Sequence, residues 1–113
     1  MAKTQSARFE IEKFNGKNNF EIWKVKMYDL LVQQGVAKAL LGKSKQPYNI
    51  TDDEWNELDG RSLSAIRLCL VDDVLFNIVS EKIAASLWTK MEKLYMAKSL
   101  PNTIPLKQQL YSL

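Results

Sequence analysis

The fold is decided by residues 19–35, which read NFEIWKVKMYDLLVQQG. The large apolar side chains of this stretch recur every three or four positions, at Phe20, Trp23, Met27, Leu30 and Leu31. This spacing puts them on one face of a helix, and Gly35 is placed to end that helix. The pattern predicts an amphipathic helix over residues 19–34.

Residues 9–14, just before this helix, predict a short extended arm. Phe9 and Ile11 alternate with other residues, and the apolar pattern then slips to Phe14. Alternation fits an extended segment better than a helix, and Asn15-Gly16 follows as a turn signal. We therefore expect residues 1–18 to form an arm and a turn that precede the helical part.

A second strong signal lies at Thr51-Asp52-Asp53-Glu54. The Thr51 hydroxyl can accept from the Glu54 amide while the Glu54 carboxylate reaches back, which is a capping box. We expect a helix from here to about residue 71, connected to the first one by a short helix over 36–41 and a loop over 43–50. Gly60 lies inside this helix and costs up to about 1 kcal/mol relative to Ala, which indicates a close helix crossing or a small kink.

The remaining residues continue the helical pattern. Residues 72–79 predict a short fourth helix, and residues 80–98 predict a fifth with Ser80 as its cap. Pro105 suits the first position of a sixth helix, which stops at Leu113 without a cap. We expect an all-α fold, a compact bundle of five to six helices with a short extended N-terminal arm. On this reading residues 19–113 form one helical lobe that is interrupted in its last helix.

The core is predicted from the apolar residues that share the inner faces of these helices. It comprises Phe20, Trp23, Met27, Leu30, Trp55, Leu58, Ile66, Leu70, Trp88, Met91, Leu94 and Tyr95. The three Trp residues lie on three different predicted helices. A shared aromatic core explains them more simply than a surface on which nucleic-acid bases stack.

The composition argues against catalysis and against a bound metal or cofactor. The chain has no His and one Cys, which excludes an intramolecular disulfide, the usual zinc ligand sets and an imidazole base. Asp52-Asp53 and Asp72-Asp73 fall at helix starts, where negative charge is favoured in any case. Cys69 lies between leucines and is expected to be a buried, unreactive thiol. We expect no enzyme activity, no metal site and no cofactor.

Charge is arranged in blocks along the chain. The formal net charge is +3, with basic residues in excess over 1–50 and 81–113 and acidic residues in excess over 51–80. The blocks fit a solvated surface, or a basic face of one copy meeting an acidic face of another. No apolar run has the length of a membrane span or of a secretion signal, so we expect an intracellular protein without membrane contact.

Four blocks of residues carry a family resemblance. They are Phe14-Asn15-Gly16 with Asn19-Phe20, Trp23 and Met27; Trp55 with Asp59, Ala65, Ile66 and Leu70; Ala85-Ser86-Leu87-Trp88 with Leu94-Tyr95; and the final run from Leu106 to Leu113. In this order, over residues 12–113, they resemble the Gag polyprotein of copia-type LTR retrotransposons, and plant elements above all. The resemblance implies the all-helical amino-terminal lobe of a capsid.

The resemblance implies a structural assembly domain of virus-like particles, located in the cytoplasm if the full Gag is present. Its partners would be other copies of itself or the rest of Gag, and RNA would bind only weakly or through a downstream zinc knuckle. We expect contacts from the arm, the loop and the acidic helix, at Phe9, Ile11, Phe14, Lys43, Lys45, Tyr48, Asp52, Asp53 and Glu57. The alternative is a Gag-derived adaptor that binds a host peptide between the arm and the first helix. A third hypothesis is direct RNA binding through the basic first half.

Overall fold

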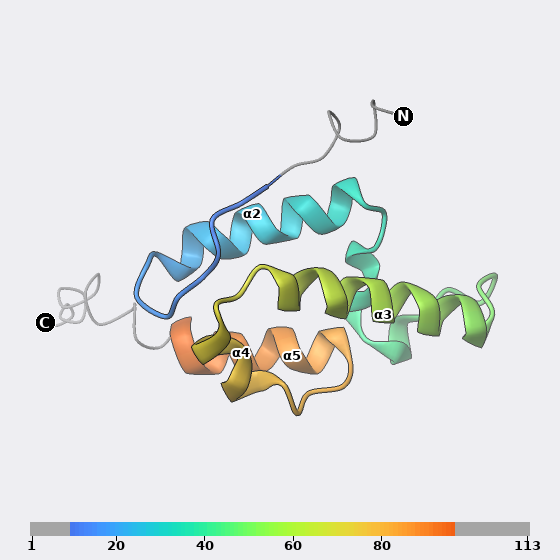
Figure 1. Cartoon of the computed structure of the whole chain (residues 1–113). Coiled ribbons are helices and arrows are strands. Elements are labelled where there is room, and N and C mark those ends of the chain that lie inside the picture. Colours follow the sequence, from blue (N-terminus) through green and yellow to red (C-terminus); the bar gives the residue numbers. More distant parts are fainter. Residues whose placement is uncertain (1–9, 97–113) are drawn as a thin grey trace, which may run out of the picture.

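The computed structural model describes residues 10–96, and this part of the chain is built from helices (Figure 1). Its α-helices are α2 (Phe20–Gln33), α3 (Asp52–Leu68), α4 (Asp72–Ile78) and α5 (Ala84–Met91). Two 3-10 helices, η1 (Ala37–Leu41) and η2 (Lys43–Lys45), connect α2 to α3, and a π-helix, η3 (Glu92–Met96), extends α5. The predicted all-α class is confirmed. Phe9 and the sixth helix expected from Pro105 lie outside the described residues.

The first predicted helix begins and ends where its local signals place it. The Asn19 side chain accepts a hydrogen bond from the Ile22 amide at 3.0 Å, which caps the start of α2. After its end, Gly35 adopts a φ of +75°, a conformation that glycine reaches without strain. The capping box of α3 is also present, with the Glu54 amide 3.1 Å from Thr51 Oγ1 and the Thr51 amide 2.9 Å from Glu54 Oε1.

Gly60 does not mark a close helix crossing. A Cβ atom built on Gly60 would meet no other atom within 4 Å, and α3 continues through it from Asp52 to Leu68. The expected close crossing is therefore wrong, because no neighbouring helix reaches contact distance of this position.

The fifth helix begins later than predicted. Ser80 does not cap it, and α5 starts at Ala84. The Ala84 amide donates to Asp59 Oδ1 of α3 at 3.1 Å, so the cap comes from a different helix. The start of α5 is therefore set by a tertiary contact.

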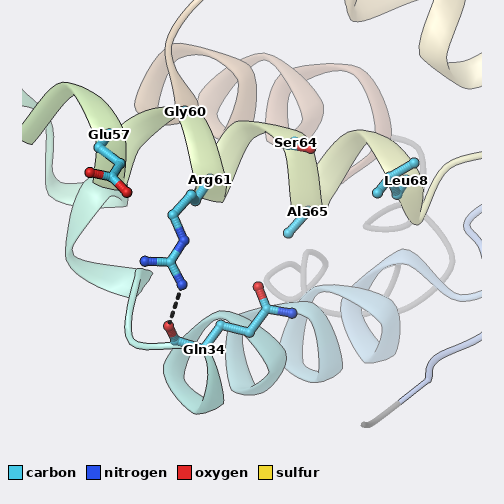
Figure 2. A pocket seen from close by; sticks show the side chains of 7 residues that line it. All are labelled: Gln34, Glu57, Gly60, Arg61, Ser64, Ala65 and Leu68. Carbon is cyan, nitrogen blue, oxygen red and sulfur yellow. Dashed lines mark hydrogen bonds between the residues drawn. The ribbon is translucent and has the colours of Figure 1, made fainter. Parts of the chain in front are cut away.

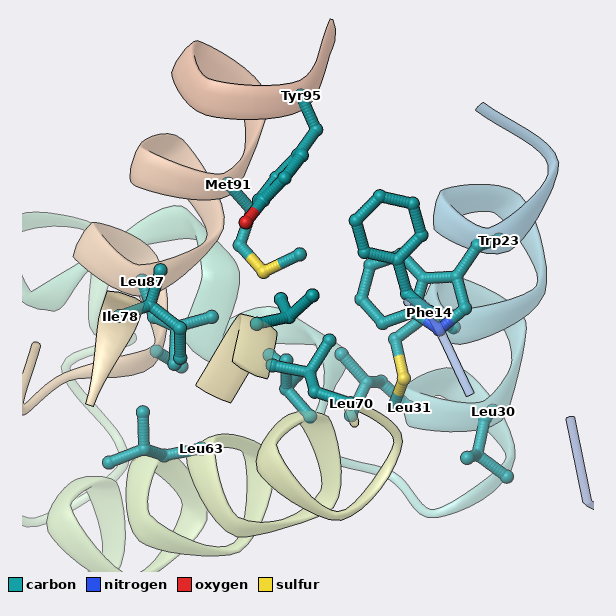
Figure 3. Close-up of a cluster of buried hydrophobic side chains, with 14 of the residues drawn as sticks. Phe14, Trp23, Leu30, Leu31, Leu63, Leu70, Ile78, Leu87, Met91 and Tyr95 are labelled. Atoms are coloured by element: carbon teal, nitrogen blue, oxygen red, sulfur yellow. The ribbon is translucent and has the colours of Figure 1, made fainter. Parts of the chain in front are cut away.

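A single core joins these elements, with α3 in contact with both α2 and α5 (Figure 1). Figure 3 shows side chains from α2, α3, α4 and the α5–η3 segment meeting in its centre. The buried cluster consists of Phe14, Phe20, Trp23, Met27, Leu30, Leu31, Val36, Ala39, Leu63, Ile66, Leu70, Val74, Ile78, Ala84, Leu87, Met91 and Tyr95. None of the helices within residues 10–96 combines the length and the apolar composition that crossing a membrane requires.

Four residues predicted for the core differ from the prediction. Trp55 is buried but lies outside the main cluster, while Leu58 and Trp88 are only partly buried at its margin. Leu94 is exposed, so its core assignment is wrong. It falls in the π-helix η3, whose wider turn advances each residue by a smaller angle than an α-helix and leaves Leu94 on the outer side while Tyr95 faces inward.

The arm is part of the core at Phe14. The Phe14 side chain is 1% exposed, and Figure 3 shows it beside Trp23. Its ring centroid lies 5.3 Å from that of Phe20, 5.6 Å from that of Trp23 and 4.9 Å from that of Tyr95. Its backbone pairs with the end of α3, because its amide donates to the Cys69 carbonyl at 3.0 Å and its carbonyl accepts from the Val71 amide at 3.1 Å. The expectation that Phe14 offers a contact for a partner is therefore wrong.

Candidate functional site

The loop residues and the acidic residues expected to make contacts lie together at the start of α3. We call Lys43, Lys45, Tyr48, Asp52 and Asp53 the tip surface. Lys43 Nζ lies 3.2 Å from Asp52 Oδ1, which folds the loop back onto the helix. All five residues are exposed, and Tyr48 is as exposed as an isolated side chain.

Two side chains of the loop donate hydrogen bonds to the Asp52 carboxylate of the tip surface. The Gln46 side chain donates to Asp52 Oδ1 at 3.1 Å, and this bond together with the Lys43 ammonium lowers the pKa of Asp52. The Lys43–Asp52 pair is solvated and adds little to stability. Within residues 10–96, Lys45 and Asp53 take part in no ion pair, so the surface presents uncompensated charges of both signs.

Glu57 lies one turn further along α3, at a groove between α3 and the end of α2 (Figure 2). The groove has a volume of about 440 Å³, and Arg61 crosses it to donate to the Gln34 carbonyl at 3.5 Å. Gly60, Leu68 and the small residues at 64 and 65 also line it.

The arm lies between two further grooves, and Ile11 borders both. One groove, which we call the arm groove, separates the arm from α2, has a volume of about 360 Å³ and is lined by Glu10, Ile11, Lys26, Asp29, Leu30, Val32 and Gln33. The other has a volume of about 340 Å³ and reaches Leu68, the last residue of α3, and Cys69, which follows it. Ile11 is consequently half-buried, with one side against the core and one side available.

The described residues do not gather catalytic or metal-binding groups. Asp52-Asp53 and Asp72-Asp73 occupy the first turns of α3 and α4. No group of three or more His, Cys, Asp or Glu side chains between residues 10 and 96 could hold a metal ion. Burial raises the pKa of the Cys69 thiol, and Lys13 only partly opposes this, so the thiol is protonated and a poor nucleophile at neutral pH.

The contact residues predicted from the sequence do not include the outer side of α2. Ile22, Val25, Tyr28 and Val32 are 52%, 57%, 47% and 48% exposed, and they form a row on the outer side of α2. We call this row the α2 stripe. Its signal was present in the sequence, because these residues recur every three or four positions opposite the buried face. Only the fold reveals that no other described helix covers that side.

Two comparisons with known proteins agree on the kind of protein that this chain is similar to. A family model described as the gag-polypeptide of LTR copia-type matches residues 27–113. The Retrovirus-related Pol polyprotein from transposon TNT 1-94 of Nicotiana tabacum is 49% identical over 106 residues, which cover 94% of this chain and 8% of that polyprotein. The chain thus spans a small part of this relative. No solved structure matches the chain.

Proposed function

Because this chain belongs to the gag polypeptides of copia-type LTR elements, we propose that it is a capsid-type structural domain that assembles with copies of itself. The observation that carries the proposal is the tip surface, on which the fully exposed Tyr48 is accompanied by charges of both signs. Tyrosine is enriched at protein interfaces, since burial of its apolar ring is favourable and its hydroxyl can still form a hydrogen bond.

Opposite charges on one surface allow it to fit another copy. Lys45 and Asp53 have no ion-pair partner within the described part of the chain, so Lys45 of one copy can approach Asp53 of the next. Pairs of this kind contribute more to orientation and association rate than to affinity, and salt screens them. Assembly is therefore proposed to weaken as the salt concentration rises. In the full polyprotein, the particles would form in the cytoplasm and other segments would bind RNA.

Analytical ultracentrifugation of the 113-residue chain tests this function. The measurement covers a concentration series from micromolar to millimolar, at low and at high salt. Tyr48→Ser is expected to weaken association about tenfold. Phe76→Ser is the matched control, because Phe76 is an aromatic residue that is 80% exposed on α4. A wild-type chain that stays monomeric at every concentration in both salts contradicts the proposal.

The second candidate function is a peptide-binding adaptor, and the arm groove favours it. Its lining combines apolar side chains, from Ile11, Leu30 and Val32, with charged residues at 10, 26 and 29. An extended peptide could place one apolar side chain there.

A peptide display library, selected against the whole chain, tests the adaptor function. Deleting the arm through residue 14 would not separate binding from folding, because Phe14 belongs to the core. Ile11→Glu is the better variant, since Ile11 is only half-buried. Peptides that bind the wild type and not this variant would support the adaptor. Selection that yields no specific peptide, or peptides that bind both proteins equally, would contradict it.

A further inference from the structure

The outer side of α2 carries more exposed apolar surface than is usual for the solvent-facing side of a helix. A helix at the surface of a globular protein usually presents one apolar face inward and polar residues outward. Here Phe20, Trp23, Met27, Leu30 and Leu31 are buried on the inner face, and the four residues of the α2 stripe are each about half exposed on the other. α2 is therefore apolar on two sides, and only one of them is covered within residues 10–96.

The spacing of the stripe suits packing against another helix. Ile22, Val25, Tyr28 and Val32 follow one another at intervals of three, three and four residues. Intervals of three and four produce the straight seam along which two helices interlock their side chains. The stripe is about 15 Å long at the rise of an α-helix, so a single helix of similar length would cover it.

Two residues of opposite charge lie beside the middle of the stripe and favour a second copy of the chain as its binding partner. We propose that the α2 stripe packs against the α2 stripe of a second copy, with the two helices antiparallel around a twofold axis. Lys26 and Asp29 are exposed beside the stripe, have opposite charges and form no ion pair within the described residues. A twofold axis that passes between them brings each Lys26 toward the Asp29 of the other copy, so the surface is complementary to itself.

The contact is expected to be weak on its own. Stable dimers bury about 800 Å² on each partner, and a stripe of this length offers less than that. Weak contacts become effective when many copies are joined in one assembly, since each additional contact is then intramolecular. The inference rests on the proposed assembly function and adds a second surface to it, on a different helix from the tip surface.

Charge reversal in the whole chain, followed by sedimentation equilibrium, tests the arrangement. Lys26→Glu and Asp29→Lys, each alone, place like charges together and are expected to weaken association several-fold. The double variant restores the pairs with reversed sign and is expected to associate within about twofold of the wild type. Val25→Glu removes the centre of the apolar row and is expected to raise the dissociation constant about tenfold. Phe76→Glu is the matched control, since it adds the same charge at an exposed apolar residue of α4.

The possible outcomes separate this inference from the proposed function. A double variant that associates no better than either single variant overturns the twofold arrangement. If the wild type associates and Val25→Glu does not weaken it, the α2 stripe is wrong while the assembly function stands. A wild type that is monomeric throughout contradicts both. If Val25→Glu lowers the unfolding temperature of the monomer instead of its association, the stripe is covered by another part of the same chain and the inference fails.

Discussion

Replacement of Phe14 provides the sharpest test of the fold, because the sequence predicts an exposed side chain at this position and the structure buries it in the core. As an exposed arm residue, it could be replaced by Ala without loss of stability. As a residue that is 1% exposed and surrounded by three aromatic rings, it should be among the most costly to replace. Removal of a buried Phe side chain costs about 3–5 kcal/mol, from lost burial and from the cavity that remains.

This loss is large for a domain of the present size. Small domains have a total stability of about 5–15 kcal/mol, so a loss of about 3–5 kcal/mol in Phe14→Ala removes between about a fifth and all of it. Each kcal/mol lowers the melting temperature of a domain of 60–100 residues by about 4–8 °C, so the expected shift is at least about 12 °C. The backbone hydrogen bonds of Phe14 with Cys69 and Val71 do not involve the ring and can persist in the variant.

Urea unfolding followed by circular dichroism measures the effect. Phe76→Ala is the control, since Phe76 is 80% exposed, and it should change the stability by less than about 0.5 kcal/mol. Phe14→Leu keeps most of the apolar volume and is expected to lose about 1–1.5 kcal/mol, which keeps the effect measurable if the Ala variant is unfolded. A loss below about 1 kcal/mol for Phe14→Ala would refute the placement of the arm in the core.

Three further predictions concern α3 and its cap. Gly60→Ala should stabilise the protein by about 0.5–1 kcal/mol in urea unfolding, because the new methyl group meets no atom within 4 Å; destabilisation would reveal a crossing that the structure lacks. Ser62→Ala should stabilise by up to about 1 kcal/mol, because Ser62 Oγ is buried without a hydrogen-bond partner among the described residues; a loss above about 1 kcal/mol would indicate a hidden partner. Asp52→Asn should flatten the acid side of the stability–pH curve slightly, because the Lys43–Asp52 pair is solvated. The pKa of Asp52 is lowered by Gln46 and Lys43, so its stabilisation is complete above the usual aspartate pKa and is lost as the pH falls through the lowered value. An unchanged curve would contradict this assignment.

The sequence predicted those parts of the fold whose signals are local. α2 was predicted over residues 19–34 and spans Phe20–Gln33, since Asn19 and Gly35 lie next to its ends. The start of α3 was also predicted, because both partners of the capping box lie within four residues. Hydrogen bonds between neighbours in the sequence can be recognised without knowing the tertiary structure.

The errors arise where distant residues decide the local structure. α3 ends at Leu68 and not near residue 71, because Cys69 and Val71 pair with the backbone of Phe14. α5 begins at Ala84 because Asp59 caps it from another helix. A pattern within one segment contains no information about such partners.

The same distinction applies to the candidate surfaces. The polar residues of the tip surface were correctly placed outside the core, because charged side chains in a loop and at a helix start are rarely buried. Phe14 was expected to be exposed and is buried, and no contact was expected on the α2 stripe, which is exposed. The sequence alone does not show whether an apolar residue is covered or exposed to solvent. The arm, α3 and η3 together determine which side of α2 is buried. Lys24 of α2 also forms an ion pair with Glu92 of η3 at 3.0 Å.

The bridge between Phe14 and the end of α3 also affects the order in which the chain folds. Its two partners are far apart in the sequence, and bringing distant residues together costs chain entropy before their contacts repay it. The arm leaves the ribosome before α3 does, yet it cannot be fixed until α3 is complete. During that interval Phe14 is an uncovered aromatic residue on a nascent chain, and exposed apolar surface promotes misassociation. Newly made copies are therefore most prone to incorrect contacts before the arm has closed over its own core.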